Sequence, residues 1–418
     1  MITRIQTKAY KNLLGIDQSL GPFAALVGPN GSGKTSFLDC IGFLRDLMRS
    51  SGGDVQPVLH ARSATFQNLL WRGQGRAFQL AIEAEIPQKV VQKMMEANRG
   101  HTSIRHEIEI GIGEDGVVGI NNEILWLVKK SQASDSRPDE FPSVQTETDT
   151  LLSSPGRARK VLLKKLPGGN DNYYPEGKET YKPVFKLGRQ KSALANVPFD
   201  PDVFPVSGWW LDYLRTGIKP FVLNSQKIKE PSPPGLPREF LPDGSNLPWM
   251  ISRLAEDGGK FNDWISHLKT AIPDIQNITT TIRPENRHAH LNVLHENGAL
   301  VPSWLVSDGT LRLLALTIPA YLPEITGTFL VEEPENGIHP QAIETVLQSL
   351  MSVYDGQVLI ATHSPIVLNR VEQGQILCFA KDANGATAIV SGDRHPTLRE
   401  WKKGNPDFGT LFASGILG

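Results

Sequence analysis

Residues Gly28–Thr35 read GPNGSGKT, which fits the phosphate-binding pattern GxxxxGK[ST]. An apolar strand is expected directly before this stretch at Phe23–Val27, and an amphipathic helix directly after it, from about Lys34 to Met48. The chemistry requires this context, because glycines let backbone N–H groups turn toward phosphates and a helix N-terminus adds partial positive charge. The stretch therefore predicts a binding site for a nucleoside triphosphate.

Each residue of this loop has an expected role. Lys34 is expected to place its ammonium on the β- and γ-phosphates, and the Thr35 hydroxyl to ligate Mg²⁺. The expected cofactors are therefore ATP and Mg²⁺. A glycine-rich turn that only imitates the loop is the alternative, and the flanking strand and helix argue against it. The predicted nucleotide-binding residues are Asn30, Gly31, Ser32, Gly33, Lys34, Thr35 and Ser36.

A second apolar strand, expected at Gly327–Val331, ends in the two acids Glu332 and Glu333. Ligands gather at the carboxyl ends of strands in a parallel sheet. We therefore expect Glu332 to hold Mg²⁺, directly or through water, and Glu333 to polarise the attacking water as general base. The alternative is a solvated acidic loop, which the phosphate loop upstream disfavours.

Two further features lie close to the acidic strand end in the sequence, one before it and one after it. Ser307 and Gly309 form a small polar turn before the helix expected at Leu311–Thr317, where they suit either an anion or an ordinary N-cap. His363 follows the strand expected at Gln357–Ala361 and would reach a γ-phosphate or the attacking water. A lone histidine is more often structural, but its place beside the other motifs favours a catalytic role.

Composition excludes several other classes of protein. The chain has 418 residues, 39% of them hydrophobic and 21% charged, and a formal net charge of −1, which is ordinary for a soluble globular protein. Its two cysteines, Cys40 and Cys378, form no CxxC pair and are expected to be small buried hydrophobes. We find no signal-peptide core and no apolar stretch long enough for a bilayer, so a cytoplasmic location is expected.

The order of these motifs resembles that of ABC-type ATPases. The motif sequences at Ser307–Arg312, Glu332–Pro340 and Thr362–Pro365 are most similar to those of the soluble, non-transporter AAA-type (AAA-21-like) ATPases related to RecF, SMC proteins and the OLD family. The likeness covers about residues 1–50 and 300–370. Members of this branch act in bacterial DNA repair, phage defence or toxin-like modules.

The resemblance implies a mechanism across two subunits. Ser307 and Gly309 of one subunit would close on the ATP held by Lys34 of the other, so that a homodimer sandwiches two ATPs. Residues Asn336–His339 would pass signals across that interface, and Lys11–Asn12 would contact the base or the phosphates. The sequence departs from the family at Glu332, where aspartate is usual, and at Asp308 inside the Ser-x-Gly turn. The glutamine that senses Mg²⁺ is not identifiable, with Gln67 and Gln79 as candidates.

The resemblance also implies a fold and a domain plan. Alternating strands and helices indicate an α/β P-loop NTPase of ABC-ATPase type with a mixed, mostly parallel sheet. The expected parts are 1–130 and 300–418, the two halves of the ATPase domain, and 131–299, an inserted Pro-rich and helical region. Ser131–Trp249 holds roughly half of the 30 prolines and predicts loops rather than long elements. The basic run Arg157–Lys165, with helical spacing, suits either a phosphate backbone or a solvated face.

The leading hypothesis is an ATP-binding and ATP-hydrolysing dimeric switch in a bacterial defence or DNA-maintenance system. It would control engagement of double-stranded DNA or a separately encoded effector protein, and no nuclease domain is expected in the same chain. A nucleotide-binding subunit of a membrane transporter and an ATP-dependent assembly protein with little turnover remain the alternatives. The tail around Trp401–Gly404 and Gly409–Phe412 suits a docked partner or, more simply, a closing packing segment.

Overall fold

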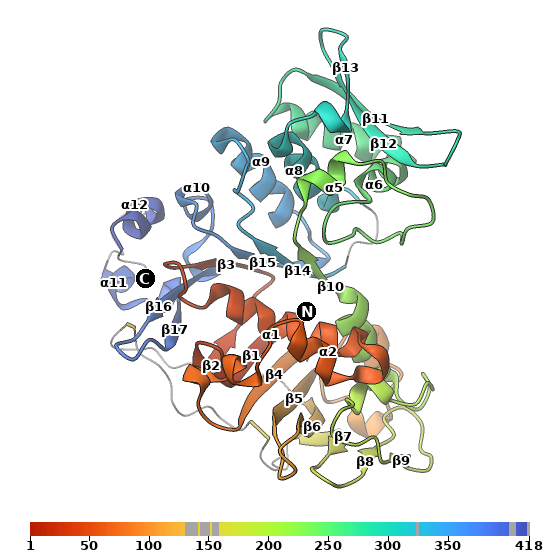
Figure 1. The fold of residues 1–418 in the computed structure, drawn as a ribbon, viewed down its shortest axis with the longest axis vertical. Coiled ribbons are helices and arrows are strands. Elements are labelled where there is room, and N and C mark those ends of the chain that lie inside the picture. Colours follow the sequence, from red (N-terminus) through yellow and green to blue (C-terminus); the bar gives the residue numbers. More distant parts are fainter. Residues whose placement is uncertain (130–140, 143–150, 153–158, 323–325, 401–406, 416–418) are drawn as a thin grey trace.

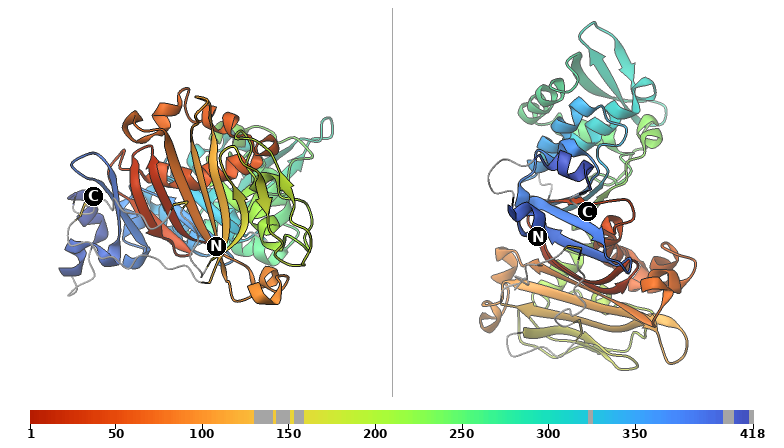
Figure 2. Two further views of the ribbon diagram at one scale, coloured as in Figure 1. Left: turned by 90° about the horizontal axis from the view of Figure 1, so that it is seen from below. Right: turned by 90° about the vertical axis from the view of Figure 1, so that its left-hand side faces the viewer.

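The computed structural model describes residues 1–129, 141–142, 151–152, 159–322, 326–400 and 407–415. In this part of the chain, strands form an eight-stranded, a six-stranded and a three-stranded sheet. Figures 1 and 2 show them stacked in layers: the eight-stranded sheet at one end, the six-stranded sheet in the middle and the three-stranded sheet at the other end. Among the described residues no helix has both the length and the apolar character that a bilayer crossing demands.

The six-stranded sheet has the strand order β10-β14-β15-β3-β16-β17. Neighbouring strands run parallel except for the hairpin of β16 and β17. Helices cover both faces of the sheet, which is why its central strands read as continuous apolar runs. The strands are β3 (Phe23–Val27), β10 (Ile218–Phe221), β14 (Gly327–Glu332), β15 (Gly356–Ala361), β16 (Ile376–Lys381) and β17 (Thr387–Ser391).

The eight-stranded sheet is antiparallel throughout. Its strands, in spatial order, are β2 (Leu13–Ser19), β1 (Ile2–Tyr10), β4 (Ala77–Glu85), β5 (Ser103–Ile112), β6 (Val118–Val128), β7 (Arg159–Lys165), β8 (Asp171–Tyr173) and β9 (Val184–Phe185). The small antiparallel sheet consists of β11 (Ile275–Ile282), β12 (Ala289–His295) and β13 (Leu300–Pro302).

Helices fill the spaces between and beyond the sheets. They are α1 (Lys34–Arg49), α2 (Val55–His60), α3 (Gln88–Val91), α4 (Pro205–Asp212), α5 (Ser225–Lys229), α6 (Leu247–Leu254), α7 (Gly258–Lys269), α8 (Asp308–Thr317), α9 (Pro340–Met351), α10 (Pro365–Leu368), α11 (Pro396–Glu400) and α12 (Phe408–Ala413).

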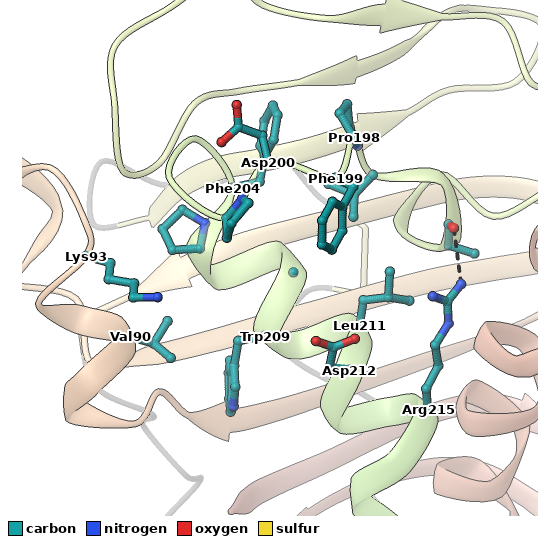
Figure 3. A pocket seen from close by; sticks show the side chains of 15 residues that line it. Val90, Lys93, Pro198, Phe199, Asp200, Phe204, Trp209, Leu211, Asp212 and Arg215 are labelled. Atoms are coloured by element: carbon teal, nitrogen blue, oxygen red, sulfur yellow. Dashed lines mark hydrogen bonds between the residues drawn. The ribbon is translucent and has the colours of Figure 1, made fainter.

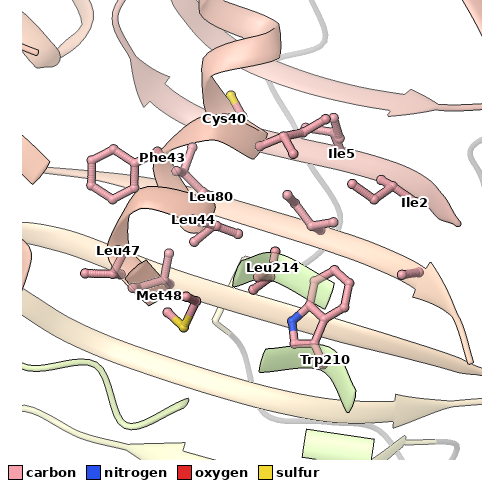
Figure 4. Close-up of a cluster of buried hydrophobic side chains, with 14 of the residues drawn as sticks. Ile2, Ile5, Cys40, Phe43, Leu44, Leu47, Met48, Leu80, Trp210 and Leu214 are labelled. Atoms are coloured by element: carbon pink, nitrogen blue, oxygen red, sulfur yellow. The ribbon is translucent and has the colours of Figure 1, made fainter. Parts of the chain in front are cut away.

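Helix α1 lies between the two large sheets and supplies one half of the core. Its buried side chains recur at helical spacing, and Phe43, Leu44 and Leu47 pack among side chains of the eight-stranded sheet (Figure 4). Trp210 and Leu214, from α4 and the turn after it, close the same cluster. Full burial of each such side chain contributes roughly 1.5–3 kcal/mol, so this layer fixes α1 and with it the loop at its N-terminus.

Helices α8 and α9 pack on the opposite face of the six-stranded sheet from α1. The reason lies in the alternation of strand side chains. Leu26 of β3 and Leu359 of β15 belong to the cluster that contains α1, whereas Val27 and Ile360 belong to the cluster that contains α8. The buried Leu314 of α8 lies in that second cluster. The N-termini of α1 and α8 are therefore separated by the sheet.

The P-loop α/β fold predicted from the sequence is confirmed, with one correction. The six-stranded sheet is mostly parallel as expected, but the larger sheet is antiparallel and was not anticipated. Strand β1 pairs with β4 although β3, the phosphate loop and α1 lie between them in the chain, and no local pattern specifies that pairing. Cys40 and Cys378 are buried free cysteines, as expected.

The stretch expected to be rich in loops also contributes strands. Within its described residues, β7, β8 and β9 extend the eight-stranded sheet, and β10 forms the edge of the six-stranded sheet. The basic run is a strand and not a helix over Arg159–Lys165. The ammonium of Lys165 pairs with Asp171 at 2.7 Å, and that of Lys160 donates to Asn98 at 2.7 Å. These two lysines are therefore occupied, and residue Arg157 lies outside the described residues.

The segment of α4 joins the eight-stranded lobe to the nucleotide-binding core. After α4 the chain forms one π-helical turn, Tyr213–Gly217, before β10. The Tyr213 hydroxyl lies 2.7 Å from the Thr328 hydroxyl of β14, and the Arg215 guanidinium donates to the carbonyl of Met48 in α1 at 2.8 Å. Two of the elements that carry the predicted site, α1 and β14, are thus tied to this segment.

The N-terminus of α4 is capped by a fully buried carboxylate. Glu176 accepts hydrogen bonds from the backbone N–H groups of Val206 at 2.6 Å and Ser207 at 3.1 Å, and from the Ser207 hydroxyl. Burial nevertheless dominates over these bonds and raises the pKa of Glu176 to about 7. The folded protein therefore holds a proton on this group more tightly than the unfolded chain does.

We expect this carboxylate to make the free energy of unfolding depend on pH. Because the folded pKa of Glu176 is raised, its contribution is fully present below its unfolded pKa and is lost as pH rises through about 7. The thermal midpoint of Glu176→Gln should then fall less between pH 5 and 8 than that of the wild type. Glu179→Gln, at an exposed position nearby, is the matched control. Equal slopes in wild type and Glu176→Gln would contradict the expectation.

Candidate nucleotide-binding site

The phosphate loop is held in place by the hairpin of β16 and β17. Gly28 has φ 148°, and a Cβ there would lie 2.1 Å from the carbonyl oxygen of Phe379. Gly33 has φ 111°, and a Cβ there would lie 2.4 Å from the Thr387 hydroxyl. That hydroxyl donates to the carbonyl of Ser32 at 2.8 Å. Only glycine fits at these two positions, so the loop's shape is set by contact with a distant strand pair.

Lys34 lies at the N-terminus of α1 and is buried. Its ammonium donates to the carbonyl oxygens of Gly28 at 2.7 Å and Pro29 at 3.0 Å. Burial lowers the pKa of Lys34 to about 8, although the nearby carboxylates, Glu333 first among them, act to raise it. The nearby carboxylates therefore offset only part of the cost of burying this ammonium, and a bound triphosphate would add further negative charge beside it.

Parallel pairing brings the predicted acids to the loop. Glu332 of β14 pairs with Ala361 of β15, and Ala361 pairs with Leu26 of β3, so the three strands end at the same edge of the sheet. The Thr35 hydroxyl donates to the Glu332 carboxylate at 2.7 Å, across a separation of 297 positions in the chain. The two predicted metal ligands are thus in direct contact.

A cavity of about 150 Å³ lies at this edge. It is lined by Asn12, Asn30, Gly31, Gly33, Lys34, Thr35, Ser36, Glu332, Glu333, Ala361 and His363. The predicted loop residues, both predicted acids and the predicted histidine therefore line one cavity. Ser32 is the exception, because it is buried and contacts Thr387 through its carbonyl.

The pair Thr35 and Glu332 fits a magnesium ion. A hydroxyl and a carboxylate are hard oxygen donors of the kind that Mg²⁺ prefers, and Mg²⁺ needs few protein ligands because it keeps waters and binds phosphate oxygens. Both side chains are exposed to the cavity side of the loop and already lie within hydrogen-bond distance of each other. The described residues contain no cluster of three or more His, Cys, Asp or Glu suited to a metal ion.

Glu333 is held in an unusual backbone conformation. Its φ is 47°, in the left-handed region, and its N–H donates to the carbonyl of Ala361 at 2.7 Å. Strain of this kind persists where the surroundings impose it and is common at functional sites. The side-chain amide of Asn336 donates to the Glu333 carboxylate. Backbone and side chain together aim this carboxylate at the cavity.

His363 is half-buried at the end of β15, and sequence reasoning missed the residue that positions it. One carboxylate oxygen of Glu335 accepts hydrogen bonds from the Thr362 hydroxyl and from the backbone N–H of His363, each at 2.8 Å. Burial and then the charge of Lys34 lower the pKa of His363, so its ring is neutral at pH 7. The available signal was the third acid in the run Glu332-Glu333-Pro334-Glu335.

Thr387 was also missed, and for a different reason. It lies 355 positions after Ser32, and only the pairing of β16 with β3 brings its hairpin to the loop. No local pattern in the sequence signals such a contact.

The Ser-x-Gly turn lies away from the phosphate cavity. The Ser307 hydroxyl accepts the N–H of Thr310 at 3.1 Å and thereby caps α8. A Cβ at Gly309 would lie 2.5 Å from the carbonyl oxygen of Gly337, so this glycine allows α8 to pack closely on the loop after β14. Neither Ser307 nor Gly309 lines the cavity, because α8 covers the other face of the sheet.

An open groove of about 680 Å³ adjoins the phosphate cavity and shares Asn12 and Ser36 with it. Lys11, Trp71 and Arg72 line its far part. The Asn12 amide donates to the carbonyl of Gly31 in the loop at 3.2 Å. This groove has the place and size for the nucleoside part of a nucleotide, next to the residues that the family resemblance pointed to.

Neither candidate glutamine lines the cavity or the groove. The Gln79 amide donates to Glu109 at 2.6 Å within the eight-stranded sheet, and Gln67 is exposed.

Fold and site together define an ATP-binding P-loop protein of the ABC-type ATPase class. The sequence profile of the family described as "AAA domain, putative AbiEii toxin, Type IV TA system" matches residues 23–369, and the chain belongs to this AAA-domain family. It falls in the branch that also contains RecF, SMC and OLD proteins.

Curated relatives match only in part. An OLD nuclease of Thermus scotoductus is 46% identical over 61 residues, which are 15% of this chain and 10% of that protein. The Old nuclease of Escherichia phage P2 is 33% identical over 92 residues, 19% of this chain and 16% of that protein. The chain thus covers less than a fifth of the length of either relative.

Solved structures match over nearly the whole chain. The SMC head bound to the C-terminal winged-helix domain of ScpA superposes with a TM-score of 0.52 at 12% identity, covering 93% of this chain and 97% of that one. The Pyrococcus furiosus SMC head with an extended coiled coil gives the same score and identity, covering 96% and 99%. At this identity the likeness shows the fold alone.

We expect ATP binding to weaken at alkaline pH. Free Lys34 loses its proton near pH 8, whereas triphosphate charge would raise its pKa, so binding above pH 8 takes up a proton. Affinity for a non-hydrolysable ATP analogue with Mg²⁺ should hold from pH 7 to 8 and then fall by up to about tenfold per pH unit. Calorimetry in two buffers of different ionisation enthalpy measures both the affinity for the analogue and the number of protons taken up on binding. Constant affinity with no proton uptake at pH 8.5 would contradict this.

Proposed function

We propose that the protein hydrolyses ATP and works as a homodimeric switch with ATP at the subunit interface. The proposal depends chiefly on one observation: Lys34, Thr35, Glu332, Glu333 and His363 line a single cavity. This set supplies a phosphate-binding cation, two oxygen ligands for magnesium, a carboxylate base and a neutral imidazole. Together they match the requirements of phosphoryl transfer to water.

Each side chain has a distinct role in the proposed reaction. The Lys34 ammonium exchanges its two carbonyl partners in the loop for phosphate oxygens, and Thr35 and Glu332 hold the metal. Magnesium, when bound, neutralises charge on the β- and γ-phosphates. The Glu333 carboxylate accepts the proton of the attacking water, and His363, neutral at pH 7, offers a hydrogen bond to the γ-phosphate.

A second copy of the chain supplies the Ser-x-Gly turn at the N-terminus of α8, which does not line the phosphate cavity of its own chain. The exposed N-terminus of α8 carries Ser307, and such a terminus favours a phosphate. In a head-to-tail dimer it faces the ATP bound to the partner's loop. Gly309 packs on Gly337, and Asn336 next to it binds the Glu333 carboxylate. A phosphate bound at α8 thus acts on a loop that holds the catalytic base of its own chain.

We place this switch in a bacterial defence or DNA-maintenance system, in the cytoplasm. The family description and the partial likeness to OLD nucleases support that setting. The SMC heads of similar fold, both of them bound to a ScpA domain, support a role in which the ATP cycle controls another macromolecule. That macromolecule is double-stranded DNA or a separately encoded effector.

Glu333→Gln tests the chemistry and the dimer together. Removing the base should lower ATP turnover by about 100-fold or more while leaving ATP affinity within a few-fold of wild type. Bound but unhydrolysed ATP should also hold the dimer, which light scattering after gel filtration will detect. Lys34→Ala, which loses the phosphate contact, should neither turn over ATP nor dimerise. Undiminished turnover in Glu333→Gln would remove Glu333 as the base.

The response to DNA tests the biological setting. We expect double-stranded DNA to raise phosphate release by the wild type several-fold and to leave Lys34→Ala at background. Phosphate release is measured with and without DNA at one fixed salt concentration, because DNA binding depends strongly on salt. If turnover is equal with and without DNA, the proposed ATPase activity stands, but the macromolecule that it controls is a protein effector and not DNA.

A further inference from the structure

The groove beside the phosphate cavity indicates a class of ligand, whereas the cavity along α4 does not. The α4 cavity, of about 430 Å³, is lined by four charged residues, Lys93, Asp200, Asp212 and Arg215 (Figure 3). Two of them are cations and two are acids, so its charge favours no particular ligand. The groove, of about 680 Å³, shares two lining residues with the phosphate cavity. It therefore receives the part of a ligand that adjoins the phosphates.

The far wall of this groove is a tryptophan beside an arginine. Among the described residues that line the groove, Trp71 is the only aromatic one. The Arg72 guanidinium lies over its ring, 5.3 Å from the ring centroid. Both residues belong to the short 3-10 turn Trp71–Gly73. An aromatic face of this kind is a surface on which a nucleotide base stacks.

The turn that carries Trp71 is anchored on both sides. Before it, the buried Leu70 forms an antiparallel β-bridge with Tyr10 at the end of β1. After Trp71, the Arg72 guanidinium donates to the carbonyl of Asn384, in the turn between β16 and β17. The same hairpin clamps the phosphate loop through Thr387. One hairpin thus fixes the Trp71 wall relative to the loop that would hold the phosphates.

Strained backbone gathers around the groove and the phosphate cavity. Six non-glycine residues of the described chain have positive φ. Glu333 borders the phosphate cavity, and Lys11 and Arg72, each with φ 51°, border the groove. Strain of this kind persists where the surroundings impose it and is common at functional sites. Half of the strained residues border these two adjoining spaces, which supports treating them as one site.

Polar side chains of the groove already have partners within the protein. The Lys11 ammonium pairs with Asp39 at 2.6 Å, and the Asn68 amide donates to the Ser63 hydroxyl at 3.1 Å. A base that enters the groove therefore gains more from the aromatic face than from hydrogen bonds to its edge. Recognition by the face depends on the area of the ring system and hardly on the groups at its rim.

We propose that Trp71 is the platform on which the base of the bound nucleotide stacks. The site then takes purine nucleoside triphosphates in preference to pyrimidine ones, and it separates adenine from guanine only weakly. The larger ring system of a purine covers more of the indole face, and Arg72 adds a cation–π contact to the same ring. This inference rests on the proposed nucleotide site and names its substrate class.

Calorimetry on the full-length chain with Mg²⁺ tests the proposal. The probes are non-hydrolysable analogues of ATP, GTP and UTP, and inorganic tripolyphosphate, which has no base. The wild type should bind the two purine analogues within about threefold of each other and about tenfold more tightly than the UTP analogue. Trp71→Ala should weaken binding of both purine analogues by about tenfold and leave that of tripolyphosphate unchanged. Trp71→Phe, which keeps a stacking face, should recover most of the loss.

Tyr354→Ala, at an 89% exposed aromatic elsewhere, is the control and should bind every probe as the wild type does. Four results would overturn the proposal: equal wild-type affinities for the ATP and UTP analogues, a strong preference between the two purines, purine binding that Trp71→Ala leaves unchanged, or tripolyphosphate binding that it abolishes. If the wild type binds none of the probes, the proposed nucleotide site itself fails. If the ATP analogue and tripolyphosphate bind but Trp71→Ala has no effect, only the base platform fails.

Discussion

The parallel register of β3, β14 and β15 is the constraint on which the rest of the site depends. It aligns Leu26, Ala361 and Glu332 across the sheet, although they come from opposite ends of the chain. The Thr35–Glu332 hydrogen bond is the direct result. A slip by one residue in β14 would turn Glu332 toward the wrong face, since side chains alternate along a strand. The buried apolar faces on both sides of the sheet make such a slip costly.

In the site that this register assembles, burial and neighbouring charge have opposite effects on the pKa of Lys34. Desolvation lowers the pKa of its ammonium, and the carboxylates of Glu333, Glu332 and Glu335 raise it only in part. The protein therefore holds a cation that gains from the arrival of a strong anion. The same cation helps to keep His363 neutral, so the imidazole can offer a hydrogen bond without adding a second charge.

The sheet also explains why one chain does not hold every part of the proposed site. Side chains that alternate along β3 and β15 send α1 to one face and α8 to the other. Ser307 caps α8 on that second face, where it cannot reach the loop of its own chain. The proposed dimer follows from this geometry as much as from the family resemblance. The loop from Glu333 to Gly337 contacts both regions, because Asn336 binds the Glu333 carboxylate and Gly337 packs against Gly309 of α8.

The sequence by itself determined the nucleotide loop, the acidic strand end, the histidine and the P-loop α/β fold. Each of these is a short pattern whose chemistry depends on neighbours along the chain. Tertiary structure alone decided the antiparallel sheet, the strand form of the basic run at Arg159–Lys165 and the clamp of Thr387 on Ser32. It also decided that Glu335 positions His363. Those contacts join residues that no local pattern relates, because strand pairing and helix packing set which distant side chains meet.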